Sequence, residues 1–243
     1  MKMSKEQFIQ TLICRAGESN IKIDESKAEK LFLYKELLVE WNEKINLTSI
    51  TADEDIIVKH FVDSLLCVEY IKSKNKIIDV GTGAGFPGLV IAIYFDGDVS
   101  ITLLDSLQKR VNFLDLVIKE LDLKNTQAIH GRAEEYAHKE EFKEMYDIAI
   151  ARAVAPLNVL LEYLSGYVRI NGECICMKAL SAQEEINNSK KAVQVLNLEL
   201  IKKITKTITY AEEITRNILI YTKKKSTPDK YPRTYGKIKK SPL

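Results

Sequence analysis

The chain has 243 residues, enough for one large domain, or for a core domain with a small addition, around a sizeable hydrophobic core. Hydrophobic residues make up 46% and charged residues 29% of it, as in an ordinary soluble globular protein. No apolar run approaches a membrane span and no signal peptide precedes the first expected helix. We therefore expect a cytoplasmic protein with no membrane partner.

The formal net charge of +2 hides an uneven distribution along the chain. Eight of the 36 basic residues but only one of the 34 acidic residues lie in residues 223–243, a net charge of +7. The remaining 28 basic and 33 acidic residues give the body a net charge of −5. A basic tail on an acidic body predicts a polyanionic partner, although a solvated tail that only aids solubility has the same composition.

The cysteines and histidines do not predict a metal site. Four cysteines are scattered without metal-type spacing, and the chain has only three histidines. We expect free thiols in a reducing compartment and no bound metal. The residues are Cys14, Cys67, Cys174, Cys176, His60, His130 and His138.

Residues 1–72 are expected to form helices. Ser4 begins a capping box, Asp24 can cap a second helix, and residues 51–54 form another capping box. Apolar residues recur at helical spacing after each cap. The sequence thus predicts a helical extension ahead of the rest of the chain.

Polar residues recur near the end of this helical region in an otherwise apolar setting. They are Asn46, Thr48, His60, Asp63 and Ser64. Capping and helix-to-sheet hydrogen bonds would explain them, and a lone histidine is more often structural. A functional role for His60 is the alternative.

A glycine-rich stretch, residues 76–93, follows the helical region. A short apolar run ends at Asp79, then Gly81, Gly83 and Gly85 precede a further apolar run. This pattern predicts a strand, a turn and a helix whose N–H groups face a ligand. Asp79 would repel a pyrophosphate but suits the ammonium group of S-adenosylmethionine (SAM), so SAM is favoured over NAD. A glycine-rich turn without a ligand is the remaining alternative.

From residue 76 onward, strands and helices alternate, which predicts a Rossmann-like α/β fold with a mostly parallel sheet. Two β-rich runs at the end predict a closing antiparallel pair. Strands are expected at 76–80, 100–105, 126–130, 146–152 and 173–178, helices at 106–121 and 181–196, and the final pair at 198–210 and 216–222.

Polar residues at the ends of the expected strands are candidates for a binding site, because carboxyl ends of parallel strands face the ligand crevice. Asp105 can accept bonds from ribose hydroxyls, or can cap the next helix. Backbone groups of Ala133 and Glu134 can contact an adenine edge. Arg152 and Lys178 reach the same edge of the sheet. The segment after Arg152 lacks the Asp-Pro-Pro-Tyr pattern of enzymes that methylate exocyclic amino groups, which argues against that reaction.

The tail, residues 223–243, combines prolines, tyrosines and bases, and we expect little fixed secondary structure in it. Basic and aromatic side chains together can bind RNA phosphates and stack on unpaired bases.

The chain as a whole is expected to have three regions: a helical extension, 1–72; a cofactor-binding core, 73–222; and a basic tail, 223–243.

Several motifs together resemble one family, the bacterial small-subunit rRNA guanine-N7 methyltransferases (RsmG or GidB). The resemblance runs from about Trp41 to the C-terminus. It implies a SAM-dependent methyltransferase acting on N7 of one guanine in 16S rRNA, on the small ribosomal subunit or an assembly intermediate, and we expect a monomer. The motifs are WNEKINLT, HFVDSL, IIDVGTGAGFPGLVIAI, LLDSLQKRVNFL, GRAEE, ARAVAPL, MKA, TPDKYPR and KKSPL.

The matching motifs also imply site residues. Gly81 and Phe86 would contact SAM, Ala133 and Glu134 the adenosine, and Arg152 the crevice between cofactor and substrate. The ribose contact of Asp105 is our own inference. Together with Asp79, Gly83 and Gly85, these residues form the expected cofactor site.

Methylation at guanine N7 requires no proton removal, because N7 carries an in-plane lone pair. Catalysis would therefore depend on aligning N7 with the methyl carbon and sulfur. The candidates that position the base are Arg152, Lys178, Asn46, His60, Asp63 and Ser64.

Two other functions are alternatives to a methyltransferase. One is a non-enzymatic RNA-binding or ribosome assembly factor. The other is an NAD-dependent oxidoreductase, although the chain has no Tyr-x-x-x-Lys pattern of a hydride-transfer site.

Overall fold

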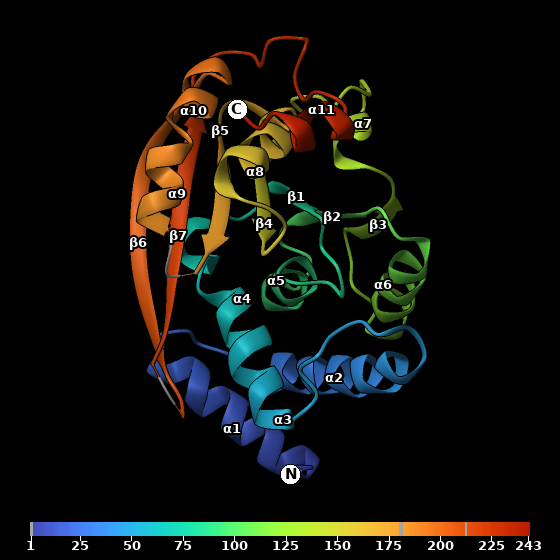
Figure 1. The fold of residues 1–243 in the computed structure, drawn as a ribbon. Helices are drawn as coiled ribbons and strands as arrows, with labels where there is room; N and C mark the ends of the chain where they lie inside the picture. Colours follow the sequence, from blue (N-terminus) through green and yellow to red (C-terminus); the bar gives the residue numbers. More distant parts are fainter. Residues whose placement is uncertain (1, 180–181, 212) are drawn as a thin grey trace.

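A seven-stranded sheet forms the centre of the computed structural model, which describes residues 2–179, 182–211 and 213–243 (Figure 1). The strand order is β3-β2-β1-β4-β5-β7-β6. Neighbours among β1 to β5 are parallel, and β7 is antiparallel to both β5 and β6. This confirms the expected fold. The strands are β1 (Lys76–Val80), β2 (Ser100–Asp105), β3 (Thr126–His130), β4 (Tyr146–Arg152), β5 (Val168–Lys178), β6 (Leu198–Thr209) and β7 (Glu213–Lys223).

The order of the strands reverses at β1, which pairs with β2 on one side and with β4 on the other. In open parallel sheets a ligand crevice forms at such a reversal, outside the carboxyl ends of the strands. The turns after β1, β2, β3 and β4 therefore meet at one edge of the sheet. Strand β5 begins five residues earlier than expected and delivers Lys178 to the same edge.

Helices cover both faces of the sheet, because alternate strand residues point to opposite sides. Ile77 joins one hydrophobic cluster with α1, α2, α5 and α6, and Ile78 joins a second cluster with α8, α10 and the C-terminal segment. The helical elements are α1 (Lys5–Glu18), α2 (Glu25–Ile45), α3 (Asp53–Asp55), the π-helix η1 (Ile56–Val62), α4 (Asp63–Leu65), the 3-10 helix η2 (Val68–Tyr70), α5 (Gly88–Phe95), α6 (Gln108–Glu120), α7 (Ala133–Tyr136), α8 (Leu157–Ser165), α9 (Ala182–Asn188), α10 (Lys190–Val195) and α11 (Tyr235–Lys240).

The first two helices begin where the sequence predicts. Ser4 and Asp24 cap α1 and α2 through their side chains. The capping box expected at residues 51–54 is wrong: α3 begins at Asp53 with no side-chain cap, and Glu54, the acid of the expected box, contacts Arg15 of α1 at 2.8 Å. A long-range contact thus replaces the local cap.

The helical extension packs against the core. Buried residues of α1 and α2 belong to the same hydrophobic cluster as Ile77 of β1. Tyr34 of α2 is fully buried and donates a hydrogen bond to the carbonyl of Ala84, within the glycine-rich turn. The extension therefore supports the turn on which the expected cofactor site depends.

The C-terminal segment differs from the expected tail with little fixed structure. Strand β7 continues to Lys223, which is fully buried, and α11 follows. Tyr231, Ile238 and Leu243 are buried in the second hydrophobic cluster. Composition failed here because a few apolar residues among many bases suffice to dock the segment.

The helix expected at 181–196 is divided into α9 and α10 at Ser189, and residue 181 lies outside the described residues. Over the described ranges, no helix is both long and apolar enough to span a membrane.

Candidate active site

The glycine-rich turn is held together by Asp79 at the end of β1. This carboxylate is fully buried, and its Oδ2 accepts hydrogen bonds from the Thr82 hydroxyl at 2.6 Å and the Gly88 N–H at 2.8 Å. Burial raises the pKa of Asp79 to about 6. Its Oδ1 has no hydrogen-bond partner among the described residues. A contact between Asp79 and a ligand ammonium group therefore stays a prediction that depends on this one atom.

Two glycines of the turn are required by close contacts. A Cβ at Gly81 (φ +74°) would lie 2.9 Å from a methyl group of Val154, after β4. A Cβ at Gly85 (φ +105°) would lie 2.4 Å from Leu89 Cδ1 and 2.7 Å from the Tyr34 hydroxyl. The turn thus fits closely against β4 and against α2, and only glycine permits both the backbone conformation and the packing.

A cavity of about 300 Å³ lies at the carboxyl ends of β1 to β4, and we call it the cofactor cavity. It brings together four predicted cofactor residues, Gly81, Asp105, Ala133 and Glu134. Tyr235 of α11 also lines it, which the sequence analysis did not predict. The other lining residues are Val80, Leu104, Ser106, Arg110, Gly131, Arg132, Ala153, Val154 and Tyr163.

Asp105 connects two walls of the cofactor cavity. Its Oδ2 accepts a hydrogen bond from the Gly83 N–H at 2.9 Å, and its Oδ1 accepts one from the Leu107 N–H at 2.9 Å. The residue preceding α6 is Leu107, so Asp105 does not cap the helix directly. A carboxylate accepts about four hydrogen bonds, which leaves capacity for ribose hydroxyls.

Ala133 and Glu134 begin the short helix α7 at the edge of the cofactor cavity. N–H groups in the first turn of a helix have no acceptor within it, so these two are free to meet a ligand edge. The Tyr167 hydroxyl donates to the Ala133 carbonyl at 2.6 Å and fixes the position of this backbone.

A second cavity, of about 380 Å³, lies beside the first, and we call it the Arg152 cavity. Ala153, whose φ is +57°, lines both cavities. A left-handed alanine is strained by about 1 kcal/mol or more, and such strain is concentrated at functional sites. The other residues lining the Arg152 cavity are Lys59, His60, Asp63, Arg152, Met177, Lys178, Ala179, Glu185 and Arg216.

Asp63 is the centre of an ion-pair network in the Arg152 cavity. The carboxylate is almost fully buried and contacts Arg152 Nη1 at 2.7 Å and Arg216 Nε at 2.9 Å. Arg152 Nη1 also donates to the carbonyl of Lys59 at 3.2 Å, within the π-helix. Arg216 is not among the residues predicted from the sequence; it lies on β7, 153 residues from its partner Asp63. Charge-assisted bonds of this kind fix side chains firmly.

His60 forms part of a stacked group. Its ring stacks on Phe86 with 4.3 Å between centroids, and Arg152 lies over the same Phe86 ring at 5.2 Å. Its Nε2 contacts the Thr48 hydroxyl at 2.9 Å. Burial and the nearby Arg152 charge lower the pKa of His60 to about 3. A neutral His60 can position neighbours but cannot supply a positive charge at neutral pH.

This lowered pKa predicts a pH-dependent stability. The unfolded chain protonates His60 below its ordinary pKa of 6.5, whereas the folded protein keeps it neutral down to about 3, so acidification favours unfolding. At about pH 5, this histidine alone should lower the free energy of unfolding by about 2 kcal/mol. We expect the free energy of unfolding, measured in urea, to fall less between about pH 7 and pH 5 for His60→Gln than for the unmodified protein. Equal declines would contradict the assignment.

The remaining predicted residues lie in different places. Lys178 lines the Arg152 cavity and contacts Glu185 at 2.7 Å and the Ala155 carbonyl at 2.8 Å. Ser64 is buried, and its hydroxyl donates to the carbonyl of His60 at 2.5 Å. Asn46 is exposed, ends α2 in a left-handed conformation and lines neither cavity. A role for Asn46 in base binding stays a prediction without a structural contact.

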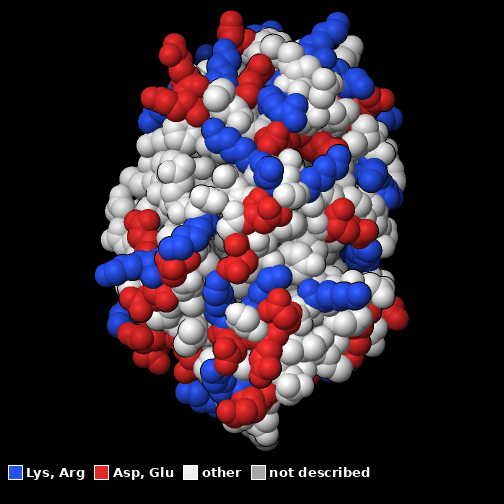
Figure 2. Space-filling view, turned by 180° about the vertical axis from the view of Figure 1, so that it is seen from behind, with Lys and Arg blue, Asp and Glu red and all other residues white. Residues whose placement is uncertain are grey.

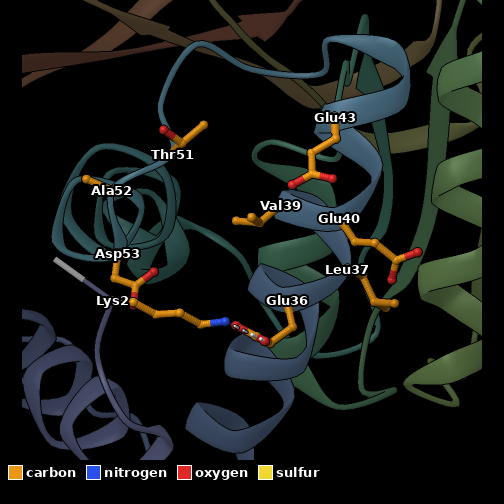
Figure 3. Close-up of a pocket in the computed structure, with 9 residues that line it drawn as sticks. All are labelled: Lys2, Glu36, Leu37, Val39, Glu40, Glu43, Thr51, Ala52 and Asp53. Atoms are coloured by element: carbon orange, nitrogen blue, oxygen red, sulfur yellow. Dashed lines mark ion pairs between the residues drawn. The ribbon is translucent and has the colours of Figure 1, made fainter.

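A larger cavity, of about 570 Å³, lies in the helical extension between α2 and the start of α3 (Figure 3). Of its acidic side chains, Glu36, Glu40 and Glu43 come from α2 and Asp53 comes from α3, and Lys2 contacts Glu36 at 3.8 Å. None of the predicted site residues lines it. Over the described ranges, no group of three or more His, Cys, Asp or Glu side chains is placed to hold a metal ion. Size alone therefore does not identify the site.

Comparison with known proteins identifies the family. The model of the GidB family, described as rRNA small subunit methyltransferase G, matches residues 27–215. The chain belongs to this family. The Ribosomal RNA small subunit methyltransferase G of Alkaliphilus metalliredigens is 46% identical over 228 residues, covering 93% of this chain and 95% of the relative. That of Clostridium tetani is 45% identical over 239 residues, covering 98% and 99%.

A solved structure agrees with the fold. The TYW2 protein of M. jannaschii, solved in complex with AdoMet, has a TM-score of 0.53 and 15% identity, covering 72% of this chain and 77% of that one. The rRNA small subunit methyltransferase G family thus confirms the predicted resemblance and enzyme class. Family membership favours neither the NAD-dependent oxidoreductase nor the non-enzymatic assembly factor.

Proposed function

We propose that this protein transfers a methyl group from SAM to N7 of a guanine in 16S rRNA of the small ribosomal subunit. The observation that supports this most directly is the pair of cavities on either side of Ala153. One has the features of an adenosine site, and the other is lined by paired basic and acidic side chains. Two ligands bound there would meet beside the end of β4.

The residues of the cofactor cavity fit SAM. The sulfonium group of bound SAM supplies an electrophilic methyl carbon. Asp105 would accept bonds from the ribose hydroxyls, and the N–H groups of Ala133 and Glu134 would contact the adenine. Asp79 does not line this cavity, so a contact between its unpartnered Oδ1 and the ligand ammonium group stays part of the proposal, and Gly81 lines the cavity in a turn that packs against Val154.

The Arg152 cavity would hold the guanine. Its cations are paired, because Arg152 and Arg216 share Asp63, and Lys178 contacts Glu185. N7 methylation leaves positive charge on the base, which unpaired cations beside the ring would oppose. Asp63 offsets one of the two guanidinium charges, and the fixed guanidinium groups can still donate hydrogen bonds to O6 or to phosphate.

The neutral state of His60 agrees with chemistry that needs no general base. Its pKa of about 3 keeps the imidazole uncharged at neutral pH, so it adds no repulsion to the methylated guanine. Through its stack on Phe86 it positions the turn after β1 against the π-helix. We therefore assign His60 a positioning role.

The RNA backbone would contact the C-terminal segment. Three basic side chains of this segment are already in ion pairs. Lys223 contacts Glu144, Lys224 contacts Glu199, and Arg233 contacts Glu162. The face in Figure 2 carries acidic and basic side chains intermingled and no broad basic surface. Three exposed lysines of α11 are available to contact phosphates. They are Lys237, Lys239 and Lys240.

The proposal is tested by methyl transfer from labelled SAM to small ribosomal subunits and to naked 16S rRNA. The modified nucleoside is identified after digestion. Subunits should come from cells that lack this activity, so that the target guanine is unmodified. We expect N7-methylguanosine at a single site.

Two controls separate the parts of the proposal. Subunits already carrying the modification should accept no further label. Label in another nucleoside would contradict N7 as the acceptor, and SAM binding without transfer to any RNA would contradict the rRNA substrate. Absence of SAM binding in calorimetry would overturn the cofactor assignment itself.

A further inference from the structure

The C-terminal segment, residues 224–243, is anchored to α8 at the end of the molecule opposite α1 (Figure 1). Before α11, Arg233 donates to the fully buried carboxylate of Glu162 from its backbone N–H, Nε and Nη2, at 2.7–2.8 Å. After α11, Asn158 donates to the carbonyl of Leu243 at 2.9 Å. The short helix between these two contacts is therefore fixed on both sides.

Tyr235, the first residue of α11, lies where this segment meets the cofactor cavity. It lines the cofactor cavity together with Asp105 and Ala133. It also lines an adjoining cavity of about 420 Å³, with Arg132 and Glu134 contributing to both. The C-terminal segment thus forms part of the wall of a site built otherwise from the ends of the strands.

The ring of Tyr235 is not needed to anchor the segment. It is 47% exposed, whereas Ile238 and Leu243 are buried and Arg233 forms the ion pair. The Arg132 guanidinium lies 5.4 Å and the Lys239 ammonium group 5.9 Å from the centre of the Tyr235 ring. A half-exposed aromatic ring beside a small polar cavity is suited to a flat aromatic ligand.

We propose that Tyr235 is a cofactor-binding residue whose ring contacts the adenosine moiety. This inference rests on the proposed function, because the cofactor must first occupy the cofactor cavity. It gives the C-terminal segment a role in cofactor affinity, separate from any role of its lysines in RNA binding. Aromatic contacts to a base add to binding affinity, and a half-exposed ring lies at the lower end of their range.

Isothermal titration calorimetry of the full-length protein tests this inference. The ligands are SAM and 5′-methylthioadenosine, which has the adenosine but lacks the amino-acid half. For Tyr235→Ala we expect a Kd about fivefold or more higher for both ligands, and for Tyr235→Phe a Kd within about twofold of the unmodified protein. Lys225→Ala, an exposed position in the same segment, is the matched control and should leave both values unchanged.

The outcomes separate the inference from the function on which it rests. If the unmodified protein binds SAM and Tyr235→Ala binds it equally well, the inference is wrong and the proposed function stands. If the unmodified protein binds neither ligand, the cofactor assignment is wrong as well. Thermal unfolding should give equal Tm values for Tyr235→Ala and the unmodified protein, because the ring is half exposed; a large loss would show that the ring anchors the segment instead.

Discussion

Arg152→Ala is expected to lower kcat/KM for methylation of the small ribosomal subunit by about 100-fold or more, because small displacements of reacting groups cost about that much. One guanidinium nitrogen of Arg152 contacts both the Asp63 carboxylate at 2.7 Å and the Lys59 carbonyl at 3.2 Å. It thus fixes one wall of the Arg152 cavity to the end of β4. Without it, the π-helix loses its contact with the strand that separates the two cavities.

The stability of Arg152→Ala should fall less than its activity. Asp63 keeps its contact with Arg216 at 2.9 Å, so the buried carboxylate is not left alone. We expect a loss of about 1–3 kcal/mol in the free energy of unfolding, typical of a lost charge-assisted bond, and a variant that still folds. Urea unfolding together with single-turnover methylation measures both quantities on the same preparation.

A matched substitution controls for the removal of a positive charge. Arg169 contacts Asp147 at 2.7 Å with about half of its side chain exposed, at the start of β5. Arg169→Ala should change neither stability nor kcat/KM by a large factor, because exposed pairs contribute about 0–1 kcal/mol. If Arg152→Ala folded and its kcat/KM for RNA were unchanged, the placement of Arg152 in the acceptor site would be wrong. An unchanged kcat/KM for Lys178→Ala would likewise contradict the placement of Lys178 there.

The elements around the cofactor cavity could be predicted because their signals are local. Each short apolar run ending in a polar residue gave a strand, and the ends of parallel strands meet by topology. Gly81, Asp105 and Ala133 therefore came together as expected. The capping box at residues 51–54 failed for the opposite reason: Arg15, 39 positions away, contacts the Glu54 carboxylate at 2.8 Å.

The partners of Asp63 and the wall at Tyr235 depend on contacts distant in sequence. The predicted antiparallel pair joined the last two strands to each other, whereas Arg216 is placed by the pairing of β7 with β5, which sets Asn217 opposite Lys178. That register brings Arg216 to the edge where Lys178 ends its strand. For the C-terminal segment, the signal was Glu162, an acid inside the apolar helix LNVLLEYLS, which requires a buried cationic partner. Composition alone marked the tail only as basic.

Arg233→Ala should be the most destabilising change in the C-terminal segment, by about 3–5 kcal/mol, because it leaves the Glu162 carboxylate unpaired. Glu162 is fully buried, and both of its oxygens accept bonds from the Arg233 guanidinium. Urea unfolding measures the loss. Limited proteolysis should also cleave the segment after its lysines sooner in the variant, because the anchor of α11 is gone.

The control for this prediction is an exposed ion pair that also contacts the C-terminal segment. Lys143 contacts Asp229 at 2.7 Å, but Asp229 is 92% exposed, so Lys143→Ala should cost less than about 1 kcal/mol. Replacing both partners, Glu162→Met with Arg233→Met, should recover much of the loss, because no buried charge then remains unpaired. If Arg233→Ala destabilised the protein no more than Lys143→Ala, the pair would not anchor the segment, and the position of Tyr235 beside the cofactor cavity would lose its support.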